Sequence, residues 1–476
     1  MPEPSGLTWA AVLLSIAVAV ASAGHAIVYK RDPRSATIWV LLIGLLPLGG
    51  SLLYLLFGIN RYQRRARRLY PGANHPPRAT DLALGHDGLP AELAGLAHLV
   101  GRTTGQPLTG GNHIEPLVNG EQAYPAMLGA IESATHSIAL ASYIFEGRGI
   151  GEQFVDALHR AHARGVQVRV MIDDVSARWV RQSAYKRLKR AGVTVATFNP
   201  TLIPARLHAA HLRNHRKLLV VDGASGFTGG MNIFSPYWRP EAPEQACHDL
   251  HFLLRGAVVA HLMQCFTEDW CDTTGERLDE NFWGRPSAPV EEHGISRARG
   301  IEAGPDEALD RMRWTFMGAL SVARHSVRIW TPYFVPDQPI IAALSAAALR
   351  AVRIDVLTPA NGDHPSVQWA ARAHYWQVME HGVRIFERPG PFDHTKLLLI
   401  DGQWCCLGSA NWDARSLRLN FEFNVEVYDA ALCKRLEALF DVARETSAAV
   451  LPEALRASPL AVRLRDGVAR LFAPIL

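Results

Sequence analysis

Two stretches of this chain share one pattern, HRKLLVVDGASGFTGGMN at residues 215–232 and HTKLLLIDGQWCCLGSAN at residues 394–411. Each reads His-x-Lys-x4-Asp-x6-Gly-[Gly or Ser]-x-Asn. Lysine is rare in the chain: the 49 residues counted as lysine or arginine include only six lysines, and two of these are Lys217 and Lys396. A chain that uses arginine almost everywhere else places lysine at the same point of both stretches, which indicates a duplicated functional unit.

The elements expected around the two stretches repeat as well. Hydrophobic periodicity predicts an α/β order in each half. Before the first stretch we expect helices at 123–134, 151–164 and 185–191 and strands at 137–145, 166–172 and 193–198. Before the second we expect helices at 308–324 and 339–350 and strands at 326–334, 352–357 and 383–386. Corresponding elements keep a nearly constant offset, so the sequence predicts an internal duplication, with residues 272–305, rich in Pro, Gly and acidic residues, as the linker.

The first part of the chain is apolar. Residues 7–28 and 36–59 contain no Asp, Glu, Lys or Arg, and each run exceeds the roughly 20 residues that a helix needs to cross a bilayer. A short polar turn at 29–35 separates them, so we expect a two-helix transmembrane hairpin. A cleaved signal peptide is the alternative, and it fits less well because no basic residue precedes Leu7 and a second apolar run follows at once.

The charges beside these runs predict an orientation. Five arginines follow the second run, at positions 61, 64, 65, 67 and 68, whereas the turn holds three basic residues, Lys30, Arg31 and Arg34. Basic residues favour the cytoplasmic side of a membrane protein. We therefore expect the rest of the chain to lie in the cytoplasm.

The overall composition sets the remaining expectations. The 476 residues divide into an anchor at 1–60, a tether at 61–110, a first half at 111–290 and a second half at 291–476. A formal net charge of +4 gives no support for a nucleic-acid partner. The six cysteines have no metal-like spacing, so we expect free thiols in a reducing compartment and no metal site. The basic, amphipathic run 460–472 fits either a bilayer surface or docking on the domain.

The residue types of the repeated motif point to phosphate chemistry. His and Lys stand two apart before a buried strand, so their side chains share one face. Doubled by a symmetric partner, they bring two imidazoles and two ammonium groups to one point, which suits a phosphodiester and a displacement in two steps. Asp222 and Asp401 end the two apolar strands, and their sequence context fits a structural role as well as a catalytic one.

The paired motifs resemble those of the phospholipase D superfamily. Four further segments resemble bacterial cardiolipin synthases. They are the apolar N-terminal runs, GNHIEPLVNGEQAYPAMLGAIESATHSIALASYIF at 111–145, RIWTPYFVPD at 328–337 and SPLAVRLRDGVARLFAPIL at 458–476. The resemblance implies two duplicated phospholipase D-like α/β halves with mixed sheets packed together, preceded by the hairpin. It also implies transfer of a phosphatidyl group through a phosphohistidine at the bacterial inner membrane, without metal, nucleotide or other cofactor.

Carried over residue by residue, the resemblance assigns roles. His215 would be the nucleophile and His394 the general acid and base, and the symmetry of the motifs leaves the reverse open. The expected phosphate ligands are Lys217, Lys396, Asn232 and Asn411. In that superfamily a carboxylate about 28 residues after the motif histidine orients a histidine, which indicates Glu422 and, on the matching strand, Asp249. Ser409 fits the superfamily pattern, whereas Gly230 stands where serine is common, a substitution that cardiolipin synthases share.

Other candidate residues have weaker patterns. Asp173 and Asp174 follow a strand and are interpreted as a solvated strand end rather than a metal site. The aromatic residues Trp330, Tyr333 and Phe334 fit a lipid cleft or a core, and Glu146 receives no role.

The leading hypothesis is a cardiolipin synthase that transfers a phosphatidyl group from one phosphatidylglycerol to the hydroxyl of another and releases glycerol. A hydrolytic phospholipase D that yields phosphatidic acid is the alternative, and an inactive lipid-binding scaffold is a third. A nuclease is disfavoured because an apolar anchor and near-neutral charge do not suit a polyanion. The acceptor lipid and the oligomeric state stay open.

Overall fold

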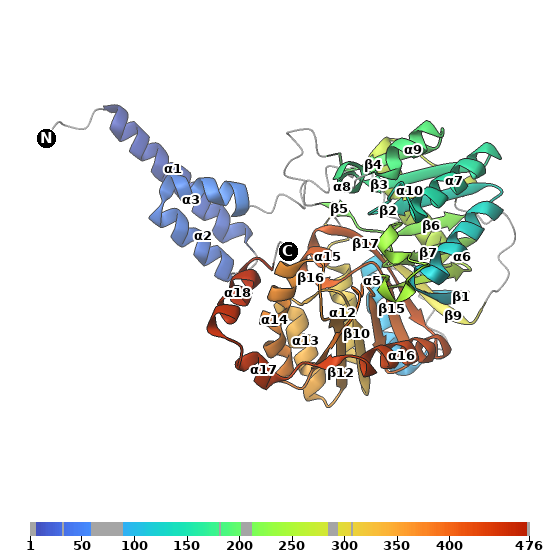
Figure 1. Cartoon of the computed structure of the whole chain (residues 1–476). Helices are drawn as coiled ribbons and strands as arrows, with labels where there is room; N and C mark the ends of the chain where they lie inside the picture. Colours follow the sequence, from blue (N-terminus) through green and yellow to red (C-terminus); the bar gives the residue numbers. More distant parts are fainter. Residues whose placement is uncertain are drawn as a thin grey trace. The chain divides into compact units, whose positions relative to one another are not determined.

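The computed structural model describes residues 6–30, 33–58, 89–179, 182–200, 212–283, 294–305 and 308–473 (Figure 1). The chain forms two compact units, Met1–Arg68 and Leu69–Leu476. The expected arginine run at 61–68 and most of the tether lie outside the described residues.

The first unit begins with one long apolar helix. α1 (Gly6–Tyr29) includes an 18-residue window, Val12–Tyr29, that is long and apolar enough to cross a membrane, and only 11% of that window is buried. Among the described residues it is the one helix that meets this description. The apolar N-terminal helix predicted from the sequence is therefore present.

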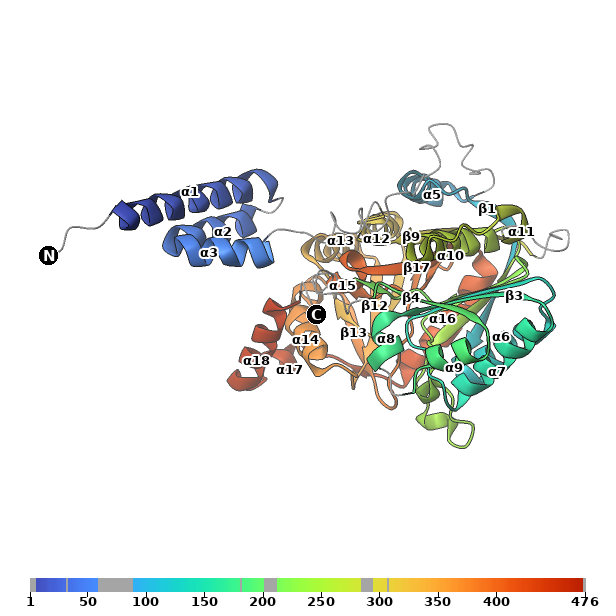
Figure 2. The ribbon, with the colours of Figure 1, turned by 90° about the horizontal axis from the view of Figure 1, so that it is seen from above.

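The continuous second helix predicted for 36–59 is wrong. The segment forms α2 (Pro33–Leu45), α3 (Pro47–Leu53) and a π-helical turn, η1 (Tyr54–Gly58). Pro47 lacks an N–H and disfavours a helical conformation of the residue before it, and Leu46 accordingly leaves the helical region with φ −133° and ψ 78°. After this break the chain reverses, and α3 lies beside α2 (Figure 2). The two helices pack so closely that a Cβ on Gly50 would lie 2.5 Å from the Leu42 carbonyl oxygen.

The second unit holds the α/β elements, and most expected boundaries agree with the structure to within a few residues. The first half contains β1 (Thr109–Val118), α6 (Asn119–Ser133), β2 (Ser137–Ser142), α7 (Ile150–Ala163), β3 (Gln167–Asp173), α8 (Asp174–Trp179), α9 (Ala184–Arg190), β4 (Thr194–Phe198), β5 (Arg213–Asn214), β6 (Leu218–Val221), β7 (Ser225–Gly229), β8 (Leu250–Arg255), α10 (Val259–Thr274) and α11 (Glu280–Trp283).

The second half repeats this order and adds short elements at its end. It contains β9 (Ser296–Ala303), α12 (Arg311–Val322), β10 (Ser326–Trp330), β11 (Phe334–Val335), α13 (Gln338–Leu349), β12 (Arg353–Pro359), α14 (Pro365–Met379), β13 (Arg384–Arg388), β14 (Leu397–Ile400), β15 (Trp404–Gly408), β16 (Trp412–Asp413), α15 (Ala414–Arg418), β17 (Asn420–Tyr428), α16 (Ala430–Glu445), β18 (Ala448–Ala449), α17 (Pro452–Arg456) and α18 (Leu460–Leu471).

The strand order makes the duplication visible. The first half runs β1-β8-β7-β6-β2-β3-β4, and the second runs β9-β17-β15-β14-β10-β12-β13. In both, the last three strands are parallel and the pairs before them are antiparallel. β1 and β9 pair with each other, so the two halves join in one 16-stranded mixed sheet (Figure 1). The motif strands β6 and β14 occupy equivalent places.

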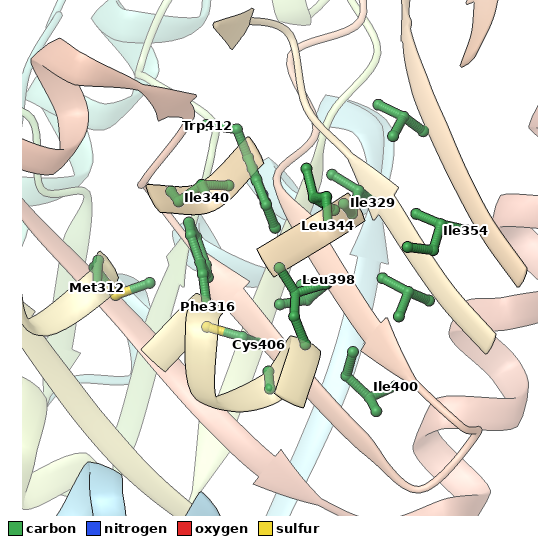
Figure 3. Close-up of a cluster of buried hydrophobic side chains, with 14 of the residues drawn as sticks. Met312, Phe316, Ile329, Ile340, Leu344, Ile354, Leu398, Ile400, Cys406 and Trp412 are labelled. Carbon is green, nitrogen blue, oxygen red and sulfur yellow. The ribbon is translucent and has the colours of Figure 1, made fainter. Parts of the chain in front are cut away.

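The expected tether and linker are partly wrong. α5 (Ala91–Thr104) contributes Leu93, Leu96, Ala97 and Val100 to the hydrophobic core of the second half, which also contains the α12 residues Met312 and Phe316. Figure 3 shows part of this core, where the rings of Phe316 and Trp412 stack with centroids 4.3 Å apart. Within the predicted linker 272–305, α10 continues to Thr274 and β9 is a central strand of the sheet.

Asp222 and Asp401 both accept hydrogen bonds from backbone N–H groups. Asp222 accepts hydrogen bonds from the N–H groups of Thr135, His136 and Ser137 at 2.8 to 2.9 Å, at the start of β2. Asp401 accepts from the N–H groups of residues 324–326 at the start of β10, at 2.7 to 2.8 Å. These contacts favour a structural role for Asp222 and Asp401, where the sequence left a structural and a catalytic role open.

Asp222→Ala is expected to lower the free energy of unfolding by about 2 kcal/mol, because three backbone donors lose a charged acceptor. The change should appear as a lower midpoint of thermal unfolding, whereas the activity expected of the repeated motif should stay within about threefold of the wild type in the folded protein. Asp401→Ala should behave alike, and Asp156→Ala on the exposed face of α7 is the control. A large loss of that activity at an unchanged midpoint would instead assign Asp222 a catalytic role.

Candidate active site

The two motif histidines face each other at the junction of the halves. The ring centroids of His215 and His394 lie 6.4 Å apart, and both side chains are buried. Backbone pairing between the halves sets this distance: the His215 N–H donates to the Phe421 carbonyl at 2.9 Å, and the His394 N–H donates to the His248 carbonyl at 2.8 Å. Each histidine is therefore held by the strand end of the opposite half.

Each histidine also meets a carboxylate from the opposite half. His215 Nδ1 lies 2.9 Å from Glu422 Oε2, and His394 Nδ1 lies 3.0 Å from Asp249 Oδ2. Glu422 is on β17 of the second half and Asp249 directly precedes β8 of the first. The structure thus brings together both carboxylates and both histidines that the sequence singled out, in crossed pairs. The crossing was not visible in the sequence.

The two carboxylates differ in their surroundings. Ser409 Oγ donates to Glu422 Oε2 at 2.6 Å, and Asn420 Nδ2 donates to its other oxygen at 3.2 Å. Burial raises the pKa of Glu422, but His215, Lys217 and Ser409 outweigh this effect, and the net pKa is lowered. Burial lowers the pKa of His215 to about 4. Neutral His215 beside ionised Glu422 carries its proton on Nδ1, which leaves Nε2 with a free electron pair.

The other pair is Asp249 and His394, and fewer polar side chains surround its carboxylate. Burial raises the pKa of Asp249 well above its usual value, although the charge of Lys396 opposes this shift. Burial and the charges of Lys396 and Lys217 lower the pKa of His394. Gly230 has the position of Ser409 here, and a Cβ on Gly230 would lie 2.3 Å from Asp249 Oδ1. The missing side chain therefore makes room for Asp249.

The lysines lie beside the histidines as expected. Lys217 Nζ donates to the His215 carbonyl at 2.7 Å, and Lys396 Nζ donates to the His394 carbonyl. Burial lowers the pKa of Lys217 to about 7 and that of Lys396 to about 8. An anion between the histidines would favour the charged form of both lysines.

Binding of a tetrahedral oxyanion is expected to weaken as the pH rises through the pKa values of the two lysines. Both lysines are charged at pH 6.5 and largely neutral at pH 9, so the affinity for tungstate should fall by about tenfold or more over this range. Isothermal titration calorimetry of the full chain in detergent measures this affinity. Lys217→Met should bind tungstate more weakly and with a flatter pH profile. An affinity that does not change from pH 6.5 to 9 would contradict the assignment.

The two motif asparagines lie beside the histidine strands. Asn232 Oδ1 accepts a hydrogen bond from the Ile144 N–H at 3.0 Å, an arrangement that directs its carbonyl side toward the backbone. Asn411 is buried directly before β16. Asn232 follows Gly229-Gly230 and Asn411 follows Gly408-Ser409, so both stand at equivalent positions of their motifs, as the sequence indicated.

Three tyrosines of the site were missed or left undecided. Tyr143 lies with its ring 5.2 Å from that of His215, and Tyr333 lies 6.5 Å from His394. They follow the equivalent strands β2 and β10, so the symmetry of the sequence gave a signal for both. The Tyr237 hydroxyl lies 3.1 Å from His394 Nδ1, which makes it a second partner of that nitrogen. No pattern in the sequence pointed to Tyr237.

The structure corrects one weaker expectation and decides others. Asp173 and Asp174 are buried rather than solvated: Asp173 accepts from the Asn214 N–H at 3.0 Å, and Asp174 binds Arg178 at 2.7 Å. Trp330 and Phe334 are buried, and Phe334 belongs to the hydrophobic core. Glu146, left without a role, accepts hydrogen bonds from Ser235. The described part of the chain contains no cluster of three or more His, Cys, Asp or Glu residues able to hold a metal ion.

Comparisons with known proteins identify the family of the chain. The family of the cardiolipin synthase, PLD-like domain matches residues 127–270 and 316–443, and the phospholipase D-nuclease N-terminal family matches residues 8–58. The chain is 32% identical over 453 residues to a cardiolipin synthase of Geobacillus kaustophilus, covering 94% of this chain and 90% of that protein. It is 30% identical over 456 residues to cardiolipin synthase 2 of Bacillus anthracis, covering 94% and 88%. The solved phosphatidylserine synthase of Haemophilus influenzae aligns with a TM-score of 0.59 at 14% identity, over 76% of this chain and 95% of that one, a likeness of fold.

Proposed function

Because the chain belongs to the cardiolipin synthase family of phospholipase D-like proteins, we propose that it joins two phosphatidylglycerol molecules into cardiolipin and releases glycerol. The observation that carries this proposal is the pair of facing histidines, each with its own lysine and its own carboxylate. One phosphodiester replaces another in the reaction, so it requires no external energy source.

In the first step, His215 Nε2 attacks the phosphorus of the donor lipid. The bond from phosphorus to the oxygen of the headgroup glycerol breaks, and that oxygen takes a proton from His394. Ionised Glu422 at 2.9 Å from Nδ1 supports His215 in this role, because it stabilises the positive charge that develops on the ring. An anionic phosphodiester between the rings favours the protonated form of His394.

In the second step, the reaction runs in the opposite sense with a new alcohol. His394 removes the proton from the acceptor hydroxyl, the oxygen attacks phosphorus, and the bond from phosphorus to His215 breaks. The products are cardiolipin and free His215. Lys217, Lys396 and the amide groups of Asn232 and Asn411 would hold the nonbridging oxygens, where the negative charge concentrates in both transition states.

The test uses full-length protein reconstituted in vesicles with phosphatidylglycerol that carries one label in the phosphate and another in the headgroup glycerol. Cardiolipin and free labelled glycerol, formed in equal amounts, are the expected products. Phosphatidic acid without cardiolipin would identify a hydrolase and overturn the proposal. A protein that binds phosphatidylglycerol but forms neither cardiolipin nor phosphatidic acid would be a lipid-binding scaffold.

The N-terminal unit supports a membrane location with a topology different from two full spans. α1, with 24 residues, is long enough to cross a bilayer, but α2 has only 13 residues, about 20 Å, and α3 turns back along it. We propose that α1 crosses once and that α2 and α3 enter and leave on one side. All eight basic residues at 30–34 and 61–68 then lie on that side, which the positive-inside rule makes cytoplasmic.

Single cysteines introduced on the two sides of α1 are expected to report this topology. A cysteine at Glu3 should react with an impermeant maleimide from outside intact cells, whereas cysteines at Ser35 and Gln63 should react only after permeabilisation. The inside location of both Ser35 and Gln63 distinguishes one span from two. Labelling of Ser35→Cys from outside, with Gln63→Cys protected, would establish two spans.

A further inference from the structure

The last helix of the chain docks on the catalytic unit by one face. α18 packs along α14, with Asp466 and Ala469 buried beneath it. Ala469 joins the hydrophobic core of the second half, and the Arg465 guanidinium lies 4.6 Å from the ring centre of Trp369 on α14. The docking that the sequence left as one of two alternatives is therefore present.

The opposite face of α18 is apolar and exposed. Successive residues of a helix turn by about 100°, so side chains at 460, 464, 468, 471 and 472 fall within an arc of about 120°. We name this set the α18 stripe: Leu460 is 69% exposed, Leu464 60%, Val468 55%, Leu471 73% and Phe472 52%. Five neighbouring apolar side chains at this exposure form a contiguous surface rather than scattered positions.

Arginines border the α18 stripe on both sides. By the same rotation, Arg463 and Arg470 lie along one edge. Arg465 lies along the other edge, where its guanidinium contacts Asp466 and the Trp369 ring. The acidic Asp466 points into the domain, where it is buried and paired with Arg465 at 2.7 Å. Arginine at the edge of an apolar stripe extends its charge to lipid headgroups while its methylene chain covers apolar surface. The combination fits an anionic bilayer surface.

The supporting helix leads to the active site. α14 begins at Pro365, two residues after Asp363, whose carboxylate accepts a hydrogen bond from the Tyr333 hydroxyl at 2.6 Å. The Tyr333 ring lies 6.5 Å from that of His394. Trp376, 54% exposed on α14, adds a residue type that favours the membrane interface. A membrane-bound α18 thus fixes the helix whose first turn lies at the active site.

We propose that the α18 stripe docks on the anionic surface of the membrane and holds the catalytic unit against the lipid layer that supplies its substrates. This inference rests on the proposed lipid substrate, and it adds a second membrane contact to that of α1. The occupant is the lipid headgroup and upper acyl region, with Arg463 and Arg470 on anionic headgroups.

The test measures contact of the α18 stripe with lipid in the full-length protein. Leu464→Cys carries an environment-sensitive fluorophore, and the protein is reconstituted in vesicles that contain a nitroxide quencher in the acyl chains. We expect severalfold stronger quenching in vesicles with about one third phosphatidylglycerol than in purely zwitterionic vesicles. Asp156→Cys on α7 is the control probe, and wild-type protein treated with the same reagent reports background labelling of native cysteines.

A matched pair of variants links the contact to turnover. The double change Leu464→Glu and Val468→Glu should lower the rate on vesicles by about fivefold or more and leave the rate in mixed micelles unchanged. Leu349→Glu, at a residue 72% exposed on α13, should change neither rate.

Each outcome is decisive. An active protein whose Leu464 probe is unquenched in anionic vesicles would overturn the inference and leave the proposed function intact. A fluorescence change of the Leu464 probe that increases with the amount of protein per vesicle and persists in detergent would show that a second copy covers the α18 stripe. This result would also overturn the inference. Quenching without cardiolipin synthesis would refute the proposed function and not the docking.

Discussion

Replacing His215 or His394 with alanine is expected to lower the rate of cardiolipin synthesis by about 10⁴-fold or more. Each change removes a group that forms a bond or moves a proton in both steps, and the residual site retains only binding and electrostatic stabilisation. Conversion of labelled phosphatidylglycerol in reconstituted vesicles measures the loss. His136→Ala and His325→Ala, which alter exposed histidines at equivalent strand starts, should leave the rate unchanged.

A second substrate separates the roles of the two histidines. A p-nitrophenyl phosphodiester has a leaving group that departs without a proton, so His394→Ala should still release nitrophenol in the first turnover. His215→Ala should release none, because no covalent bond to the enzyme forms. The reverse pattern would make His394 the nucleophile, and substantial synthesis by either variant would refute the mechanism with two histidines.

Glu422→Gln is expected to lower kcat by about 10²- to 10⁴-fold, with little change in KM. The amide has nearly the shape of the carboxylate and can remain beside His215 and Ser409, but it lacks the charge that stabilises the developing imidazolium. Because the net pKa of Glu422 is lowered, the carboxylate is ionised throughout the neutral range, and the loss should be the same at pH 6.5 and pH 8. Steady-state rates at both pH values measure it.

Two comparisons make this prediction specific. Ser409→Ala removes one hydrogen bond to Glu422 and should cost only about tenfold. Asp249→Asn alters the equivalent carboxylate of the other pair and should affect mainly the steps in which His394 moves a proton, so release of the nitrophenyl group in the first turnover should be largely retained. A kcat of Glu422→Gln within a factor of three of the wild type would contradict the role proposed for the charge.

Much of the second unit could be predicted because its signals are local. The alternation of Val168, Val170 and Ile172 and the apolar runs before Asp222 and Asp401 specify strands from a few residues each. The repeated order of elements then predicts the duplication. The two lysines at 217 and 396 were informative because the chain has only four other lysines and uses arginine at its remaining basic positions.

The parts that were missed depend on contacts between distant residues. Nothing near Glu422 in the sequence says that it faces His215 rather than the histidine of its own half. The burial of α5 depends on partners such as Met312 and Phe316, which lie far along the chain. The broken second apolar segment is a different case, because Pro47 inside it was a local signal for the break.

The crossed pairs of histidine and carboxylate predict how the protein behaves when its chain is divided into two fragments. A first half expressed alone would contain His215 without Glu422 and Asp249 without His394, so neither fragment would hold one intact pair. Two separately produced fragments, divided near residue 290, would recover activity only when they associate.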